Sequence, residues 1–289
     1  MPVLYVVATP IGNLNDMSPR VRQTLESCDL IAAEDTRVTM KLTQVLGIHK
    51  PMISCHRHNE DGRKNEIVER MLAENLSVAL TCDAGTPGIS DPGEGLVAAA
   101  WEAGISVVPV SGPSAVVTAL SVSGFDTREF AFYGFLPREG RDMDEKLRQI
   151  RARGISVVVL YESPHRAREL LRHIDSVLPE AQVCVCCDLT KKFERIDRGP
   201  VASVLARLNE NPNAEKGEYC IVMDLSQLPA EEKPSEETDV TPEQRLAMLL
   251  CGGMTLDEAC AKLKEEGVRR NEIYRAKLKL ISIAEEITR

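Results

Sequence analysis

Short apolar runs alternate with amphipathic stretches through the first 125 residues. Runs of this length predict buried strands, and they cover residues 4–8, 30–33, 52–55, 78–80 and 106–110. Helix signals lie between them: Ser18-Pro19 is a cap followed by proline, residues 38–46 stop at Gly47, and residues 59–74 carry one apolar side. This alternation predicts an α/β lobe over residues 1–125, with a largely parallel sheet.

The pattern breaks near residues 121–128 and then restarts. Strand-like runs cover residues 130–133, 157–161, 182–187, 195–199 and 218–225, and helical patterns cover residues 141–151 and 201–209. Ser163-Pro164 predicts a further helix start. Because the last strands follow one another closely, we expect a mixed or antiparallel sheet in a second α/β lobe, residues 126–225.

Residues 226–240 and the tail differ from both lobes. The segment 226–240 holds five acids, two prolines and one lysine, which is typical of a linker. Residues 241–289 predict three helices, at 242–250, 255–266 and 271–287, separated by Gly252-Gly253 and Gly267. Three short helices predict an all-helical module of helix-turn-helix size.

Composition narrows the class of protein. The 289 residues are 43% hydrophobic and 27% charged, which excludes disorder as a description of the whole chain. The net charge of −9 argues against nucleic-acid binding through general electropositivity. Since the linker carries −4 and the tail +1, the two lobes hold −6, so any RNA contact must be local.

Neither a membrane nor a metal is indicated. No run approaches the roughly 20 apolar residues of a membrane span, and the N-terminus lacks the features of a signal peptide. The nine cysteines lie mostly in apolar runs, which is typical of reduced thiols in a cytosolic protein. Cys184-Val-Cys186-Cys187 matches no zinc-ligand spacing. We therefore expect a cytoplasmic protein with no metal site.

Three turns rich in glycine and proline each follow an apolar strand, at residues 8–13, 83–93 and 111–115. In a parallel α/β sheet such turns lie at the carboxyl edge, where ligands bind. Glycine lets the backbone approach a ligand, and proline fixes the loop beforehand. Neither a P-loop nor a G-x-G-x-x-G turn is present, so the common nucleotide sites are not supported.

The ordered segments TPIGNL, AEDTR, DAGTPGISDPG, SGPSA, FYGFLP, YESPHR and KGEYCIV resemble the tetrapyrrole-methylase superfamily, especially its members that methylate small-subunit ribosomal RNA. The resemblance covers residues 3–224 and extends to the helical tail. It implies two α/β lobes with a cofactor cleft between them. It further implies S-adenosylmethionine as methyl donor, the 2′-hydroxyl of a cytidine in 16S ribosomal RNA as acceptor, and a homodimer.

The resemblance also implies which residues bind the cofactor. They come from the three turns and from strand ends of the second lobe: Pro10, Ile11, Gly12, Gly85, Thr86, Pro87, Ile89, Ser114, Ala115, Tyr161, Leu189 and Glu218. Many relatives carry aspartate where this chain has Thr86. The nearest acids here are Asp83 and Asp91, and which of them meets the cofactor stays open.

A ribose hydroxyl is a weak nucleophile, so a positioned base would assist its methylation. Glu162, next to Tyr161 at a strand end, and Asp83 are the catalytic candidates. Each has a structural alternative: Glu162 would favour the start of the helix after it, and Asp83 would shape its own loop as an Asx-turn.

Cations near the same sheet edge are candidate RNA contacts, because guanidinium groups bind phosphate bidentately. They are Arg37, Arg57, His165, Arg166 and Lys191, with Arg270 in the tail. The alternatives are a capped helix start around Arg37 and solvated loops elsewhere. Phe193, amid cations, would either stack on a base or lie in a strand core.

Two other functions stay open. One is methylation of a tetrapyrrole or a modified protein residue. The other is a regulator without enzymatic activity that binds nucleic acid through the helical tail. The intact glycine-proline turns argue against the regulator. Acidic lobes favour a small ribosomal subunit over naked RNA as the substrate.

Overall fold

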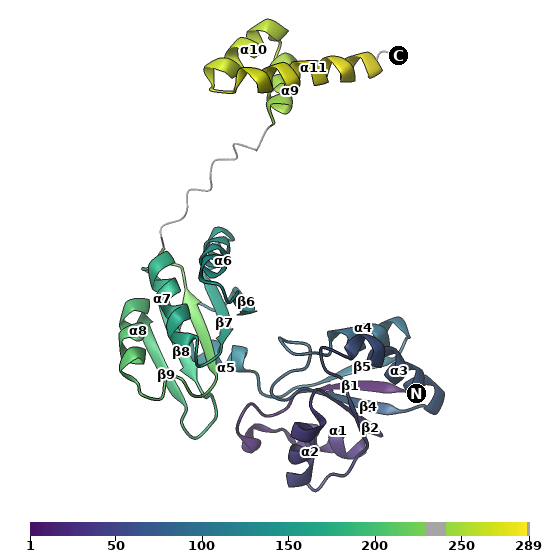
Figure 1. Cartoon of the computed structure of the whole chain (residues 1–289). Coiled ribbons are helices and arrows are strands. Elements are labelled where there is room, and N and C mark those ends of the chain that lie inside the picture. Colours follow the sequence, from purple (N-terminus) through teal and green to yellow (C-terminus); the bar gives the residue numbers. More distant parts are fainter. Residues whose placement is uncertain (229–240, 288–289) are drawn as a thin grey trace. The chain divides into compact units, whose positions relative to one another are not determined.

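A computed structural model describes residues 1–228 and 241–287 (Figure 1). The chain divides into two compact units, Met1–Leu228 and Pro229–Arg289. Both predicted α/β lobes belong to the first unit. The predicted linker, from residue 229 onward, lies outside the described residues.

The first lobe contains a five-stranded sheet in the order β3-β2-β4-β1-β5. Every strand pair in it is parallel, as the sequence predicts. The strands are β1 (Val3–Val7), β2 (Leu30–Ala33), β3 (Met52–Ser54), β4 (Ser77–Thr81) and β5 (Ser106–Val110). Because β1 lies between β4 and β5, the strands that lead into the three glycine-proline turns are neighbours.

Helices cover both faces of this sheet. Ser18 caps α1 (Pro19–Ser27) by accepting a hydrogen bond from the Val21 N–H, as predicted. Val21 and Leu25 of α1 pack on one face, and α3 (Glu60–Glu74) with α4 (Glu94–Glu102) packs on the other. The short helix η1 (Leu14–Asp16) follows β1, and α2 (Thr36–Val45) follows β2.

The second lobe contains a mixed five-stranded sheet in the order β6-β7-β10-β8-β9. Only β6 and β7 pair in parallel; the other three pairs are antiparallel, which confirms the prediction. The strands are β6 (Phe130–Phe135), β7 (Val157–Glu162), β8 (Gln182–Cys187), β9 (Arg195–Pro200) and β10 (Tyr219–Asp224).

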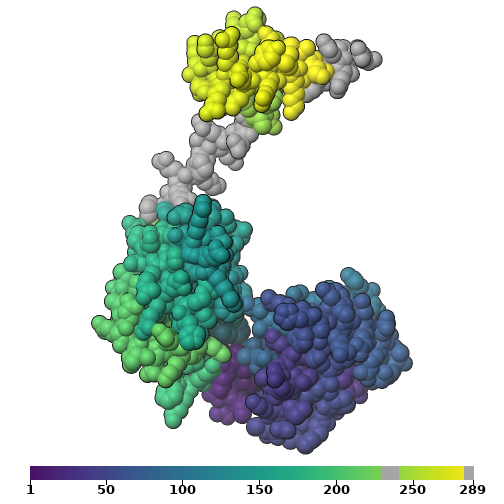
Figure 2. Space-filling model, viewed as in Figure 1, coloured from purple at the N-terminus to yellow at the C-terminus, as the bar shows by residue number. Residues whose placement is uncertain are grey.

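One helix joins the two lobes. On one face of the second sheet lie α6 (Gly140–Ala152), α7 (Ala167–Val177) and α8 (Val201–Glu210). The other face is covered by α5 (Ala115–Ser123), which follows the third turn of the first lobe. Val116, Ala119 and Leu120 of α5 are buried against that sheet, so the lobes share a core. Figure 2 shows the two lobes meeting along part of their facing sides, with a hollow beside the junction.

The predicted helix start at Ser163-Pro164 is wrong. Residues 163–166 form a turn, and α7 begins only at Ala167. The Ser163 hydroxyl donates to Glu162 Oε1 and does not cap the helix. Its carbonyl accepts the N–H groups of both Arg166 and Ala167, which closes the turn before the helix starts.

The second unit holds α9 (Pro242–Cys251), α10 (Leu256–Glu265) and α11 (Arg270–Ile287), which confirms the three predicted helices. Capping boxes at Thr241/Gln244 and Thr255/Glu258 start the first two of them. Their core consists of Leu246, Ala259, Leu263, Ile273 and Ala276. None of the helices in the described part of the chain has the length and apolar character that crossing a membrane requires.

A buried carboxylate supports the second glycine-proline turn. Glu60 is 8% exposed, and its Oε1 accepts the N–H groups of Gly93, Gly95 and Leu96 at 3.1, 2.8 and 3.2 Å. These groups begin α4, whose cap residue, Gly93, has no side chain to satisfy them. The negative charge also complements the positive end of the helix dipole.

Replacing Glu60 by alanine should therefore lower the free energy of unfolding by about 3 kcal/mol, because buried donors lose a charged acceptor. Urea denaturation measures the change. Glu69→Ala, at an exposed position of the same helix, is the matched control and should change it by less than about 0.5 kcal/mol. Equal effects of the two substitutions would contradict the supporting role of Glu60.

Candidate functional site

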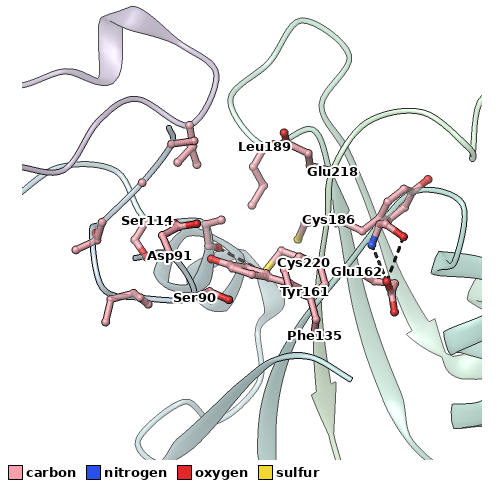
Figure 3. A pocket seen from close by; sticks show the side chains of 18 of the residues that line it. Ser90, Asp91, Ser114, Phe135, Tyr161, Glu162, Cys186, Leu189, Glu218 and Cys220 are labelled. Carbon is pink, nitrogen blue, oxygen red and sulfur yellow. Dashed lines mark hydrogen bonds between the residues drawn. The ribbon is translucent and has the colours of Figure 1, made fainter. Parts of the chain in front are cut away.

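A cavity of about 400 Å³ lies where the turns of the first lobe face the sheet of the second. Figure 3 shows Ser90, Asp91 and Ser114 on one side of it and Tyr161, Cys186, Leu189 and Cys220 on the other. The cavity is thus assembled from segments that are far apart in the sequence.

The wall from the first lobe consists of the three turns held close together. Thr9 and Gly85 exchange two backbone hydrogen bonds, of 2.8 and 3.1 Å, which join the first turn to the second. Gly85 has φ +85°, a conformation that residues with a side chain rarely adopt. At Gly112 a Cβ atom would lie 3.0 Å from the Cβ of Ala8, so the third turn also depends on glycine to approach β1.

Most of the wall from the second lobe is uncharged, although Glu162 and Glu218 also line the cavity. Tyr161, Cys186 and Cys220 come from the neighbouring strands β7, β8 and β10 and line the cavity. Burial raises the pKa of the Tyr161 hydroxyl well above its usual range and that of the Cys220 thiol to about 12, so both stay neutral. The Cys220 thiol donates to the Ala115 carbonyl at 3.6 Å, which connects this wall to α5.

Asp91 gives the cavity its most perturbed acid. Burial, followed by the nearby charges of Glu34 and Asp83, raises the pKa of Asp91 to about 6. Burial also raises the pKa of Glu34, whose carboxylate accepts the N–H of Asp83 at 3.2 Å. Above pH 6 the cavity therefore presents a partly desolvated negative charge, which favours a cationic ligand.

The structure brings most of the predicted cofactor residues to this one cavity. Nine of the twelve line it: Ile11, Gly85, Thr86, Ile89, Ser114, Ala115, Tyr161, Leu189 and Glu218. Pro10 and Gly12 line a separate hollow of about 280 Å³, and Pro87 is buried within its turn. Their binding roles remain predictions.

The two predicted catalytic acids are not brought together. Asp83 lines the separate hollow, and its Oδ1 accepts the N–H of Asp35 at 3.2 Å. Glu162 borders the cavity, but it follows Tyr161 on β7 and lies on the other side of that strand (Figure 3). Its Oε1 accepts the N–H of Ser163 at 2.7 Å and lies 3.4 Å from Arg166, whereas its buried Oε2 has no hydrogen-bond partner among the described residues. These contacts favour a positioning role for Asp83 and for Oε1 of Glu162.

The predicted RNA contacts differ in solvent exposure and in whether they are paired within the chain. Arg37, Arg57 and His165 are exposed, although Arg37 pairs with Asp35 at 2.6 Å. The Arg166 side chain is 19% exposed, and its guanidinium group donates to the Pro137 carbonyl at 2.9 Å. In the helical unit Arg270 is exposed.

Lys191 is also engaged. Its ammonium group pairs with Glu218 at 2.9 Å and with Asp188 at 3.3 Å. Its side chain lies so close to Gly12 that a Cβ there would clash with the Lys191 Cγ. Nearby Phe193 is 76% exposed on the loop between β8 and β9, so its strand-core alternative is wrong.

Several cavity residues were not among the predicted site residues. Ser90 lies in the segment DAGTPGISDPG and Phe135 in FYGFLP, so the motifs contained both positions without singling them out; Asp91, which the sequence left open beside Asp83, also lines the cavity. The sequence predicted Cys186 and Cys220 as buried core thiols. The apolar runs around them do not show whether such a thiol lies in the core or lines a cavity.

Comparison with known proteins identifies the family. The family described as Tetrapyrrole (Corrin/Porphyrin) Methylases matches residues 3–205. The chain belongs to the tetrapyrrole methylase family. Two solved structures of uroporphyrin-III-C-methyltransferase from Thermus thermophilus share the fold of this tetrapyrrole methylase. One has 17% sequence identity and a TM-score of 0.50, and the match covers 77% of this chain and 94% of that one.

Curated relatives match this tetrapyrrole methylase along nearly its whole length. A Synechocystis protein named ribosomal RNA small subunit methyltransferase I is 42% identical, with 97% of this chain and 99% of that protein covered. A Bacillus subtilis protein of the same name is 38% identical, with 96% and 94% covered. The tail is therefore part of what these proteins share.

The raised pKa of Asp91 predicts a pH dependence of stability. Between about pH 4 and pH 6 the folded protein retains a proton that the unfolded chain releases, so stability falls as the pH rises through this range. An asparagine at position 91 does not titrate, so Asp91→Asn should not lose stability in this way. The free energy of unfolding of Asp91→Asn should therefore rise relative to that of the wild type from pH 4 to about pH 7. Urea denaturation across this range tests the trend.

Asp61→Asn is the control for that series. Lys64 lowers the pKa of Asp61, which is exposed, so the sign of its contribution is opposite. A constant difference between Asp91→Asn and the wild type at all pH values would show that Asp91 titrates normally.

Proposed function

We propose that this chain is an S-adenosylmethionine-dependent methyltransferase that methylates the 2′-hydroxyl of a cytidine ribose in 16S ribosomal RNA. The observation that carries the proposal is near full-length identity of about 40% to proteins named ribosomal RNA small subunit methyltransferase I. The cavity between the lobes supports it, because nine residues expected to bind the cofactor line that one space.

The cavity fits a cofactor of this kind. S-adenosylmethionine carries a sulfonium and an ammonium group, and Asp91 offers these charges a complement opposite the neutral side chains of Tyr161 and Cys220. The bound cofactor supplies a methyl group attached to a good leaving group, so the chain mainly aligns the acceptor. The backbone of Gly85 to Ile89 and the side chains of Tyr161 and Leu189 would hold it.

Asp91 is the acid best placed to accept the proton of the ribose hydroxyl. It lines the cavity, whereas Asp83 does not, and Oε1 of Glu162 is engaged by Ser163 and Arg166. With a pKa of about 6, its carboxylate is ionised at neutral pH and still basic enough to assist. Asp83 and Glu162 would then position the loops that carry the site.

The substrate is proposed to be a small ribosomal subunit in the cytoplasm, acted on by a homodimer. The lobes carry −6, and Arg166 and Lys191 are largely engaged in contacts within the chain. Of the RNA contacts predicted in the lobes, Arg57 and His165 are then the basic side chains left for phosphate. Such a surface suits a folded particle better than naked RNA.

Two assays separate this proposal from its rivals. The purified protein should bind S-adenosylmethionine in calorimetry, which a regulator without enzymatic activity would not do. With labelled cofactor and small subunits from cells that lack the enzyme, label should appear on the 2′-oxygen of one cytidine. Label in a base, in a tetrapyrrole or in a protein would overturn the proposed substrate.

Gly85→Ala should raise the Kd for S-adenosylmethionine by about tenfold or more. The substitution imposes strain at φ +85° and places a methyl group 3.6 Å from Ile11 Cγ2, against the cavity. Gly104→Ala is the matched control, because Gly104 has φ +69° and no atom within 4 Å of the added Cβ. If both variants lose stability equally and neither loses affinity, Gly85 has no role in binding.

A further inference from the structure

Strand β6 is interrupted by a β-bulge close to the cavity. Phe132 is paired with Val159 and Gly134 with Leu160, so Tyr133 is an extra residue in β6. Gly134 adopts φ +61°, which its lack of a side chain allows. Bulges of this kind often redirect a side chain next to an active site.

The bulge changes which way Phe135 points. In a regular strand, residues three apart point to opposite faces, so Phe132 and Phe135 would be on different sides. With the extra residue, both rings meet Tyr161 edge to face, at centroid distances of 4.9 and 5.9 Å. Phe135 therefore lies on the cavity side of the sheet (Figure 3).

Phe135 lines the cavity but remains 58% exposed, while Ile11 and Leu189 of the same cavity are 8% and 7% exposed. The ring thus lies at the open side of the cavity. The bulge lies against the neighbouring loop, because a Cβ at Gly134 would lie 3.2 Å from the Ser90 Oγ.

Resting on the proposed function, we propose that Phe135 is the platform on which the base of the acceptor nucleotide stacks. An unstacked base is commonly held against an aromatic side chain, and the contact needs no charge. That suits lobes with a net charge of −6. A cavity of about 400 Å³ is near the lower limit for one ligand, so the nucleotide lies at the mouth.

A cation adjoins the same place. Arg57 donates to the Ser90 carbonyl at 3.2 Å and is exposed, which leaves part of its guanidinium group available beside the loop that touches β6. If a base stacks on Phe135, the phosphate of the same nucleotide would lie near Arg57. The ring and the guanidinium group together match one nucleotide turned out of the RNA.

The test is steady-state methylation of small subunits with Phe135→Ala, Phe135→Leu and Phe135→Trp. The alanine and leucine variants should raise KM for the subunits about 10- to 100-fold, with kcat changed less than about threefold, because stacking holds ground and transition states alike. Phe135→Trp keeps a flat ring and should restore KM to within about threefold of the wild type.

Phe130→Ala is the matched control, since Phe130 begins the same strand and is 44% exposed outside the cavity. All variants should keep the wild-type Kd for S-adenosylmethionine. A parallel rise in that Kd would assign the ring to the cofactor, and a KM unchanged by Phe135→Ala would refute stacking while the proposed function stands. If the wild-type protein transfers no methyl group to subunits, the proposed function itself fails, and this inference fails with it.

Discussion

The site depends on the way β1 is placed between β4 and β5. Three turns separated by as many as a hundred residues come from three adjacent parallel strands, and the Thr9–Gly85 backbone pair fastens two of them together. Each close approach requires glycine, at φ +85° for Gly85 and against Ala8 for Gly112. Without this adjacency, the same segments would be three unrelated loops.

The second lobe supplies the other wall of the cavity. Its sheet offers a neutral face of tyrosine and buried thiols, and α5 links that face to the third turn through a shared apolar core. Because α5 follows β5 directly, the position of the second wall is coupled to the position of the first. The cavity is consequently formed by the packing of two lobes, and a change in α5 would affect both walls.

Few charged side chains line the cavity between the lobes. Burial and the neighbouring acids raise the pKa of Asp91 and leave a negative charge where a cationic ligand would lie, while several predicted RNA contacts are engaged by acids or carbonyls. With the proposed RNA substrate, an acidic protein would then hold it by shape, by a few arginines and by uncharged contacts. Phe135, redirected by a bulge, is suited to such a contact.

The sequence by itself determined the strands, most of the helices other than α4 and α5, the two α/β lobes with a helical tail, and the three glycine-proline turns. These features depend on local periodicity, helix caps and glycine positions, which can be recognised in the sequence alone. It did not determine the late start of α7, because the Ser163 hydroxyl had an alternative partner in Glu162. The sequence predicted correctly that Tyr161 lies in the site, but it did not determine that Phe193 is exposed or that Asp83 lines a separate hollow, because the surroundings of these two residues come from other segments.

Only the tertiary structure decided which acid faces the cavity, which cations are free and where Phe135 points. The sequence left open whether Asp83 or Asp91 meets the cofactor, but strand order and loop course put Asp83 in a separate hollow and Asp91 in the cavity. A single extra residue in β6 reversed the side of one aromatic ring. Such outcomes depend on contacts between distant segments, and no local pattern records them.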